Sequence, residues 1–168
     1  ESHISGTDRV CEAAKILNLP DNRFIINLQG DEPFVPIDLL ELIQNDFNKN
    51  TCDVITASQE ITNMNDLQNP SCVKVHTTNN YADDFQRICE VNAENASHHL
   101  GIYGYRLSTL HKLVELAPTE RELELKLEQL RFMDNTLSIY LSSYTNTAQA
   151  GIHTQEDVDN AILYLKNL

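Results

Sequence analysis

The 168 residues include 25 acidic and 12 basic side chains, which gives a formal net charge of −13. This length predicts one domain, and 41% hydrophobic residues suffice for a packed core rather than a disordered chain. Basic clusters are absent, so nucleic acid is not an expected partner, and no apolar run reaches the ~18 residues of a membrane span.

The four cysteines are at positions 11, 52, 72 and 89. Their spacing is too wide for a Cys-x-x-Cys metal motif, and they are too few for a secreted disulfide scaffold. The sequence opens at Glu1 and shows no apolar signal-peptide core. We therefore expect free thiols and a cytoplasmic protein.

The first half of the sequence predicts alternating helices and strands. Apolar residues at helical spacing indicate a helix over residues 8–17, and the apolar, β-branched run at 23–28 indicates a strand covered on both faces. The polar segment 29–33 then lies at the carboxyl end of that strand, where open α/β sheets bind ligands. A helix over 37–47 and strands over 54–58 and 73–77 follow.

The second half continues this alternation. Residues 79–98 are polar and poorly periodic, as in an arm or a surface loop, after which 100–106 indicates a strand and 108–116 a helix. Capping-box spacing at Thr119 predicts a helix to about Met133, and the same spacing at Thr154 predicts the final helix. The pattern favours an α/β sheet protein.

Two short segments are candidate ligand sites. The segment Ser5-Gly6-Thr7-Asp8-Arg9 directly precedes a helix, so its amides and hydroxyls can receive an anionic or polar group. Ser, Thr and Asp are also common helix caps, and that alternative stays open. Asp31 follows a buried strand, a position suited to a magnesium ion bridging substrate phosphates, although a solvated turn has the same pattern.

Further polar candidates surround the strand at 100–106. His99, Gly101 and Tyr103 differ by two positions and therefore share one strand face. The imidazole and the phenol can donate hydrogen bonds to a polyhydroxy substrate, or be partly buried structural groups.

The predicted helix at 119–133 carries several charged and polar residues. Glu128 lies one helical turn after Glu124 and three residues before Arg131, with Gln129 beside it. Solvated charge pairing is the default explanation for such spacing. These residues alone do not indicate a ligand.

Five blocks together resemble 3-deoxy-manno-octulosonate cytidylyltransferase, the CMP-Kdo synthetase of Gram-negative lipopolysaccharide synthesis. The blocks run in family order over almost the whole chain: Ser-Gly-Thr-Asp-Arg at 5–9, Asn-Leu-Gln-Gly-Asp-Glu-Pro at 27–33, Asn-Pro with Val-Lys-Val at 69–75, His-Leu-Gly-Ile-Tyr-Gly-Tyr-Arg at 99–106 and Leu-Glu-Gln-Leu-Arg at 127–131. The last two blocks favour the Kdo enzyme over the related sialic acid cytidylyltransferases.

The resemblance implies a three-layer Rossmann-like nucleotidyltransferase of the glycosyltransferase-A-like fold, with one cytidylyltransferase domain over 1–168 and usually a homodimer. It implies transfer of a cytidylyl group from CTP to 3-deoxy-D-manno-octulosonate (Kdo) with Mg²⁺. Ser5, Gly6 and Arg9 would then line the nucleotide pocket, and Asp31 would bind the metal. The sugar would be held by Gln29, His99, Tyr103, Glu128 and Gln129.

Four departures from the family pattern accompany these matches. The family begins with a strand and an Arg/Lys-rich phosphate loop, and this sequence starts after them, so we expect an N-terminally incomplete fold. His153 stands where the family has its second magnesium ligand, and neutral imidazole suits that hard cation poorly. Gln86 replaces the Ser of a Phe-Ser-Arg element, and Leu125 replaces a Glu.

Two other functions stay open on these residues. A non-catalytic or decayed homologue that binds a sugar acid or a partner subunit would also account for His153, Gln86 and Leu125. A cytidylyltransferase for another acidic sugar ranks lower, because the most specific blocks are of the Kdo type.

Overall fold

The computed structural model describes residues 5–89, 96–146, 148, 151–152 and 154–166. Its helices are α1 (Gly6–Ile16), α2 (Ile37–Lys49), the 3₁₀ helix η1 (Met64–Leu67), α3 (Leu107–Glu115), α4 (Glu120–Leu125), α5 (Glu128–Asp134) and α6 (Gln155–Lys166). Its strands are β1 (Phe24–Asn27), β2 (Val54–Glu60), β3 (Lys74–Thr78), β4 (Tyr81–Gln86), β5 (Ala96–Arg106) and β6 (Ile139–Ser143). Over these ranges, none of the helices has the length and apolar character needed to cross a membrane.

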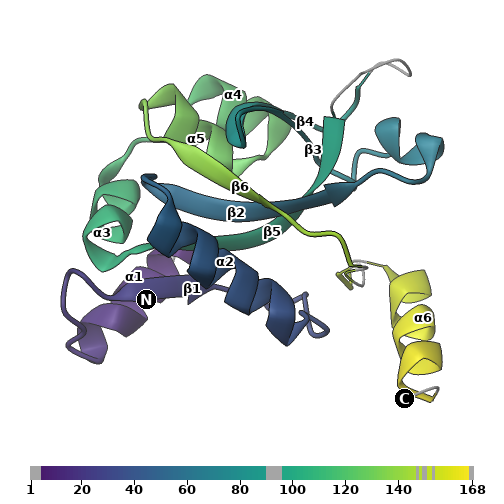
Figure 1. Cartoon of the computed structure of the whole chain (residues 1–168), viewed down its shortest axis with the longest axis horizontal. Coiled ribbons are helices and arrows are strands. Elements are labelled where there is room, and N and C mark those ends of the chain that lie inside the picture. Colours follow the sequence, from purple (N-terminus) through teal and green to yellow (C-terminus); the bar gives the residue numbers. More distant parts are fainter. Residues whose placement is uncertain (1–4, 90–95, 147, 149–150, 153, 167–168) are drawn as a thin grey trace.

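The six strands form one mixed sheet in the order β1-β5-β2-β6-β4-β3 (Figure 1). Strands β2 and β6 run parallel, and the other pairs are antiparallel. The long strand β5 also pairs with β3, so the β3–β4 arm folds back along the start of β5 and curls the sheet. Strand β1 lies at the sheet edge and pairs with β5.

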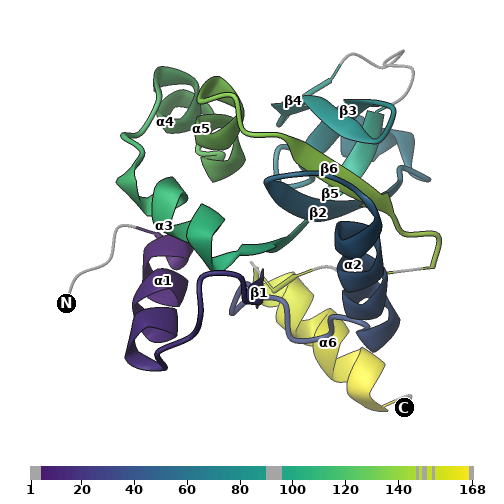
Figure 2. The same cartoon turned by 60° about the vertical axis from the view of Figure 1, so that its left-hand side comes forward.

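Helices cover both faces of the sheet, which gives the expected three-layer α/β arrangement. Figure 2 shows α1, α3, α4 and α5 on one side and α2 on the other. Helix α2 buries Leu39, Ile43 and Phe47, which recur every four residues and pack near Ile55 and Ile102. This spacing explains why the sequence pattern locates the helix correctly.

The opposite face carries the larger core. Helix α1 packs on α3, and their apolar faces cover Tyr105 of β5. Leu110, Leu113 and Leu130 are fully buried in this cluster. Each such side chain contributes about 1.5–3 kcal/mol through removal of its surface from water. The sheet face that bears His99 and Tyr103 is therefore held rigidly against α1, α3 and α5.

Three strands differ from the sequence prediction. Strand β4 lies inside the polar stretch 79–98, so the arm interpretation is correct for this part, and β5 begins at Ala96 rather than at Leu100. Main-chain pairing explains both, because β4 pairs with β3 while the His99 N–H donates to the Val73 carbonyl at 2.8 Å. The short strand β6 was not predicted at all, and it pairs in parallel with β2.

The single helix predicted over 119–133 is wrong, because the structure has two helices, α4 and α5. Lys126 between them is in the left-handed conformation, with φ of 53°. The Arg87 guanidinium donates to the carbonyls of Leu125 and Lys126, at 2.5 and 2.9 Å. A continuous helix would use those carbonyls for its own ladder, so the arginine contacts replace the helical hydrogen bonds.

All four cysteines are free thiols, as predicted. Burial raises the pKa of Cys52 and of Cys72 to about 11. Both therefore stay protonated near neutral pH, where the thiolate needed for reaction is scarce.

Candidate functional site

The N-terminus of α1 is built on a capping box. Ser5 Oγ accepts a hydrogen bond from the Asp8 amide at 3.3 Å, and the Asp8 carboxylate accepts one from the Ser5 amide at 2.9 Å. The capping interpretation of this segment is thus confirmed. A β-carbon added to Gly6 would lie 3.6 Å from both Arg9 Nη2 and Gln29 Oε1, so these three residues meet at the start of the helix.

Gln29 extends from the end of β1 across the middle of β5. A β-carbon added to Gly101 would lie 4.0 Å from Gln29 Cγ, and nothing else of the described chain comes nearer. Gly101 sits between His99 and Tyr103 on the same strand face. Both added carbons would lie at ordinary van der Waals distance, so Gly6 and Gly101 mark where the Gln29 side chain passes, and neither is needed to make room for it. Within the described residues no glycine has a positive φ, so unusual backbone angles do not explain these two glycines either.

His99 and Tyr103 point the same way, as predicted, with ring centroids 5.6 Å apart. Both side chains are buried, since 6% of His99 and 9% of Tyr103 are exposed. Phe85 packs edge-on against His99 with ring centroids 4.9 Å apart, and Phe132 packs edge-on against Tyr103 with ring centroids 6.4 Å apart. Aromatic neighbours thus fix both rings in a single orientation.

Hydrogen-bond accounting assigns the tautomer of His99. Thr56 Oγ1 lies 2.7 Å from the Ile102 carbonyl, 3.0 Å from the Leu100 carbonyl and 2.9 Å from His99 Nε2. The hydroxyl has one proton, which a carbonyl oxygen takes, so His99 Nε2–H donates to Thr56 and Nδ1 is the acceptor. Burial, with a smaller contribution from His98, lowers the pKa of His99 to about 3. The imidazole is therefore neutral under ordinary conditions.

Tyr103 and Tyr105 share this sheet face and stay protonated. Burial, reinforced by the charge of Glu128, raises the pKa of Tyr103 well above its usual value, and burial does the same for Tyr105. Tyr103 can thus act as a hydrogen-bond donor at any physiological pH. The Tyr105 hydroxyl is buried without a protein partner in the described part of the chain.

Glu128 opens α5 and contacts the start of α1. Thr7 Oγ1 donates to Glu128 Oε2 at 3.0 Å, and Thr7 is buried. The neighbouring Gln129 is 3% exposed. The predicted spacing of Glu124 and Glu128 along one helix is wrong, because the break at Lys126 separates them.

Arg131 is not part of a solvated charge row. It lies buried and holds Glu122 through Nε at 2.7 Å and through a second contact from Nη2. The Glu122 contacts, stronger than the cost of burial, raise the pKa of Arg131. This pair anchors α4 on α5, while Glu128 faces α1.

Asp31 lies exposed in the turn after β1. Its carbonyl accepts a hydrogen bond from the Ile152 amide at 2.8 Å, so the C-terminal segment returns to this turn. His153, the sequence neighbour of Ile152, lies outside the described residues. Across the described ranges, no group of three His, Cys, Asp or Glu residues is arranged to hold a metal ion. Any metal there would need ligands from a substrate as well.

Comparison with known proteins identifies the family. The Cytidylyltransferase family model matches residues 1–139. The chain is 31% identical to 3-deoxy-manno-octulosonate cytidylyltransferase 2 of Actinobacillus pleuropneumoniae serotype 5b, covering 99% of the chain and 72% of that protein. The Francisella tularensis subsp. novicida 3-deoxy-manno-octulosonate cytidylyltransferase is 34% identical, over 95% of this chain and 69% of the relative. The chain belongs to the 3-deoxy-manno-octulosonate cytidylyltransferase family.

The family's fold is also the fold of this chain. A solved structure of CMP:2-keto-3-deoxy-manno-octonic acid synthetase complexed with CTP superimposes with a TM-score of 0.86 at 30% identity. That match covers 99% of this chain and 70% of the other. The nucleotidyltransferase fold expected from the sequence blocks is thereby confirmed, whereas the individual roles of the site residues stay predictions.

Two departures from the family pattern lie at the end of strand β4 and at the end of helix α4. Gln86 Oε1 accepts a hydrogen bond from Cys89 Sγ at 3.2 Å, and Gln86 Nε2 donates to Asp84 at 3.1 Å. Leu125, where the family has a carboxylate, presents its carbonyl to Arg87 and its side chain to the core. Gln86 therefore contributes to the hydrogen bonding of the arm, and Leu125 to the packing of α4 on the core.

Sequence reasoning missed several residues that shape this family site. Thr7 forms a hydrogen bond with Glu128, and Thr56 forms one with His99. Arg87 connects the Pro70 carbonyl, at 2.8 Å, to the break between α4 and α5. Thr7 lies in a matched block and could have been singled out there. Nothing in the sequence indicates the partners of Thr56 and Arg87, which are remote in the chain.

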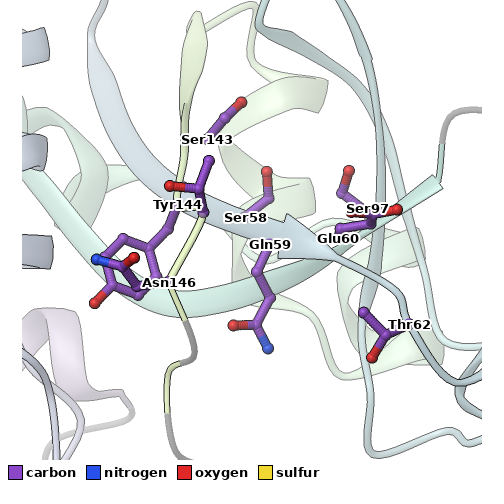
Figure 3. A pocket seen from close by; sticks show the side chains of 9 residues that line it. Ser58, Gln59, Glu60, Thr62, Ser97, Ser143, Tyr144 and Asn146 are labelled. Carbon is purple, nitrogen blue, oxygen red and sulfur yellow. The ribbon is translucent and has the colours of Figure 1, made fainter.

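A polar cavity of about 380 Å³ adjoins the site at the ends of β2 and β6 (Figure 3). Ser58 of its wall pairs with His99 in the β2–β5 ladder. Asn146 and the Tyr144 hydroxyl both donate to Asp38 at 2.9 Å and lower the pKa of that carboxyl. Among the described residues that line the cavity, Glu60 is the one carboxylate and none is basic, so this lining is not suited to phosphate. The lining residues are Ser58, Gln59, Glu60, Thr62, Ser97, Ser143, Tyr144, Thr145 and Asn146.

Proposed function

We propose that this chain transfers a cytidylyl group from CTP to Kdo, giving CMP-Kdo and pyrophosphate. The observation that carries the proposal is the meeting of the family blocks at the start of α1. Gly6 faces Gln29, and the next residue, Thr7, binds Glu128. Gln29 in turn lies over the β5 face that bears His99 and Tyr103. Blocks distant in sequence thus form one cluster of polar side chains, in which the His99 and Tyr103 rings are buried.

The hydrogen-bonding groups of this cluster suit a polyhydroxylated acid sugar. His99 offers an unprotonated Nδ1, Tyr103 a permanent hydroxyl donor and Glu128 a carboxylate acceptor. We infer that these groups, with the amides of Gln29 and Gln129, orient the sugar by hydrogen bonds. Ser5, Gly6 and Arg9 would lie against the nucleotide, where the Arg9 guanidinium supplies positive charge.

The reaction forms a bond from the sugar's anomeric oxygen to the α-phosphorus of CTP. The bond from that phosphorus to the pyrophosphate oxygen breaks, and the hydroxyl proton is released. Correct positioning of the hydroxyl in line with the leaving group is the main contribution of the sugar-binding residues. This gives the protein a role in orientation rather than in covalent catalysis.

We propose Mg²⁺ as the cofactor and Asp31 as its protein ligand. Magnesium commonly takes one or two carboxylates together with substrate phosphates, so a single exposed carboxylate at a strand end fits such a site. When bound, the ion neutralises charge on the phosphates and the leaving group. His153 replaces the second carboxylate ligand of the family pattern, and neutral imidazole there would weaken magnesium binding or shift the metal preference towards ions that imidazole suits.

Pyrophosphate release tests this function directly. The chain is incubated with CTP, Kdo and magnesium, and Asp31→Asn is compared with Asp21→Asn, an exposed aspartate whose carboxylate lies 3.8 Å from His111. We expect Asp31→Asn to lose at least ~100-fold in rate, as for removal of a main electrostatic group, and Asp21→Asn to match the parent. Kdo binding without turnover in the parent chain would favour the non-catalytic sugar-acid binder. The same rate in Asp31→Asn and the parent at saturating magnesium would exclude Asp31 as the ligand.

The homodimer remains a prediction from the family. In the family the contact lies in the region between Lys74 and His99, which here includes strand β4 and the exposed side chain of Ile88. Light scattering over a range of protein concentrations measures the mass directly. A mass of one chain at all concentrations would contradict the dimer.

A further inference from the structure

Lys74 is a fully buried lysine at the start of β3. Its side chain is 0% exposed, and its ammonium contacts four main-chain carbonyls. The distances to the carbonyl oxygens of Cys72, Asn69 and Asp66 are 2.7, 3.0 and 3.1 Å, and the Arg87 carbonyl is the fourth contact. A buried charge is costly unless polar groups replace its water shell. Here main-chain oxygens perform that replacement.

The cage joins three parts of the arm. Asp66 belongs to η1, Asn69 and Cys72 to the turn that follows it, and Arg87 to the segment after β4. An ammonium has three protons, so four carbonyls exceed its donors and one contact is shared. Two of these carbonyls also accept main-chain hydrogen bonds, the Asp66 carbonyl from the Asn69 amide at 3.2 Å and the Asn69 carbonyl from the Cys72 amide at 3.1 Å, so the ammonium is an additional partner for them. Without a positive charge at the centre, they would repel one another.

The same backbone holds His99. The Val73 carbonyl, between two residues of the cage, accepts the His99 N–H at 2.8 Å. Lys74 itself stands opposite His98 in the β3–β5 ladder. Phe85, on the strand that precedes Arg87, packs against the His99 ring. A change in the cage would therefore reach the imidazole through both its main chain and its aromatic neighbour.

We propose that the Lys74 ammonium serves as a resident monovalent cation of a carbonyl cage, and that the cage positions His99. Oxygens at 2.7–3.1 Å from a single positive centre are the type of ligand shell that potassium and ammonium ions receive from carbonyl groups. Lys74 is thus a positioning residue, and it acts on the site through Val73. The effect of the cage on His99 rests on the proposed function, whereas the cage itself does not.

The test is chemical rescue of Lys74→Ala. This variant leaves a carbonyl-lined gap in which a small cation can replace the lost ammonium. At matched ionic strength we expect the unfolding midpoint to fall by at least ~10 °C in lithium or tetramethylammonium chloride. Ammonium or potassium chloride should recover at least about half of that loss. Lys112→Ala, at an exposed lysine of α3, is the control and should show no dependence on the cation.

Equal recovery in all four salts would overturn the proposal, because it would reduce the effect to charge screening. An unchanged midpoint in Lys74→Ala would overturn it as well. If Lys74→Ala does not fold, the parent chain labelled with ¹⁵N-lysine decides. A caged ammonium exchanges its protons slowly and gives an Nζ–H signal at neutral pH, whereas exposed lysines do not. The absence of any such signal would contradict the cage.

Kdo titration separates this proposal from the proposed function. We expect Lys74→Ala to bind Kdo about 10-fold more weakly in lithium chloride, a loss of ~1.4 kcal/mol, and to regain affinity in ammonium chloride. If ammonium chloride restores stability but not Kdo affinity, the result would support the cage and exclude its effect on His99. A parent chain that does not bind Kdo would refute the proposed function, while cation-selective stability would still support the cage.

Discussion

Thr7 Oγ1 donates a hydrogen bond of 3.0 Å to Glu128 Oε2, and so connects the first helix of the described chain to α5. Thr7→Val keeps the shape of the side chain and removes this donor. The carboxylate then loses its orientation, and we expect Kdo affinity to fall about 5- to 10-fold. Isothermal titration measures the change. Thr7→Ser, which keeps the hydroxyl, should bind like the parent, and an equal loss in both variants would point to packing instead.

The buried Glu122–Arg131 pair should dominate the stability of the α4–α5 unit. Side-chain exposure is 9% for Arg131 and 10% for Glu122, so Glu122→Gln leaves a buried positive charge without its partner. We expect a loss of about 3–5 kcal/mol in the free energy of unfolding, measured in urea. The matched control is Arg121→Ala, which breaks ion pairs to Asp84 and Asp134 from a side chain that is 47% exposed. That change should cost at most ~1 kcal/mol, and similar losses in the two variants would contradict the prediction.

His99 gives the protein an acid-sensitive stability. Its pKa is about 3 in the folded chain against 6.5 for the ordinary group, because burial disfavours the imidazolium. Below pH 6.5 the His99 imidazole is protonated in the unfolded chain but stays neutral in the folded chain. The free energy of unfolding therefore decreases as pH falls from 6.5 towards 3. The slope is at most ~1.4 kcal/mol per pH unit.

The variant His99→Asn removes this titration. Urea unfolding at pH 7, 6, 5 and 4 should therefore show a flatter acid dependence than in the parent, whatever the absolute stability at pH 7. Parallel curves for the two proteins would mean that His99 is protonated in the folded chain.

Gly104 is required by close packing between strands. A β-carbon there would lie 2.6 Å from the Phe24 ring and 2.8 Å from Ile55. Gly104→Ala should therefore force β1 and β2 apart, at a cost of about 1–3 kcal/mol. Thermal unfolding checks this against Gly30→Ala, where the added carbon meets nothing within 4 Å. A midpoint unchanged in both variants would show that the sheet absorbs the methyl group.

Local patterns in the sequence predict much of this fold. The four-residue repeat of Leu39, Ile43 and Phe47 defines α2, and the capping box at Ser5 defines the start of α1, because both signals act within a few residues. Strand β4 is different, since its acidic residues oppose strand formation and its pairing with β3 decides the outcome. The break at Lys126 likewise depends on Arg87, 39 positions earlier.

The arrangement of the candidate site could likewise be predicted only in part from the sequence. Alternation along one strand puts His99 and Tyr103 on one face, and the observed ring contact confirms it. Glu128 acquires its partner from α1 instead of from its own helix, which spacing could not reveal. Lys74 lies in a matched block, yet only the folded arm brings four carbonyls around it.

The hydrogen bond from the Ile152 amide to the Asp31 carbonyl joins two segments that lie far apart in the sequence. Strands β1 to β6 and the helices between them are complete before residue 152 leaves the ribosome. The turn that bears Asp31 receives this partner only after the strands of the sheet have been synthesised. A nascent chain can therefore hold its core before the turn that bears Asp31 is fixed by its hydrogen bond to Ile152.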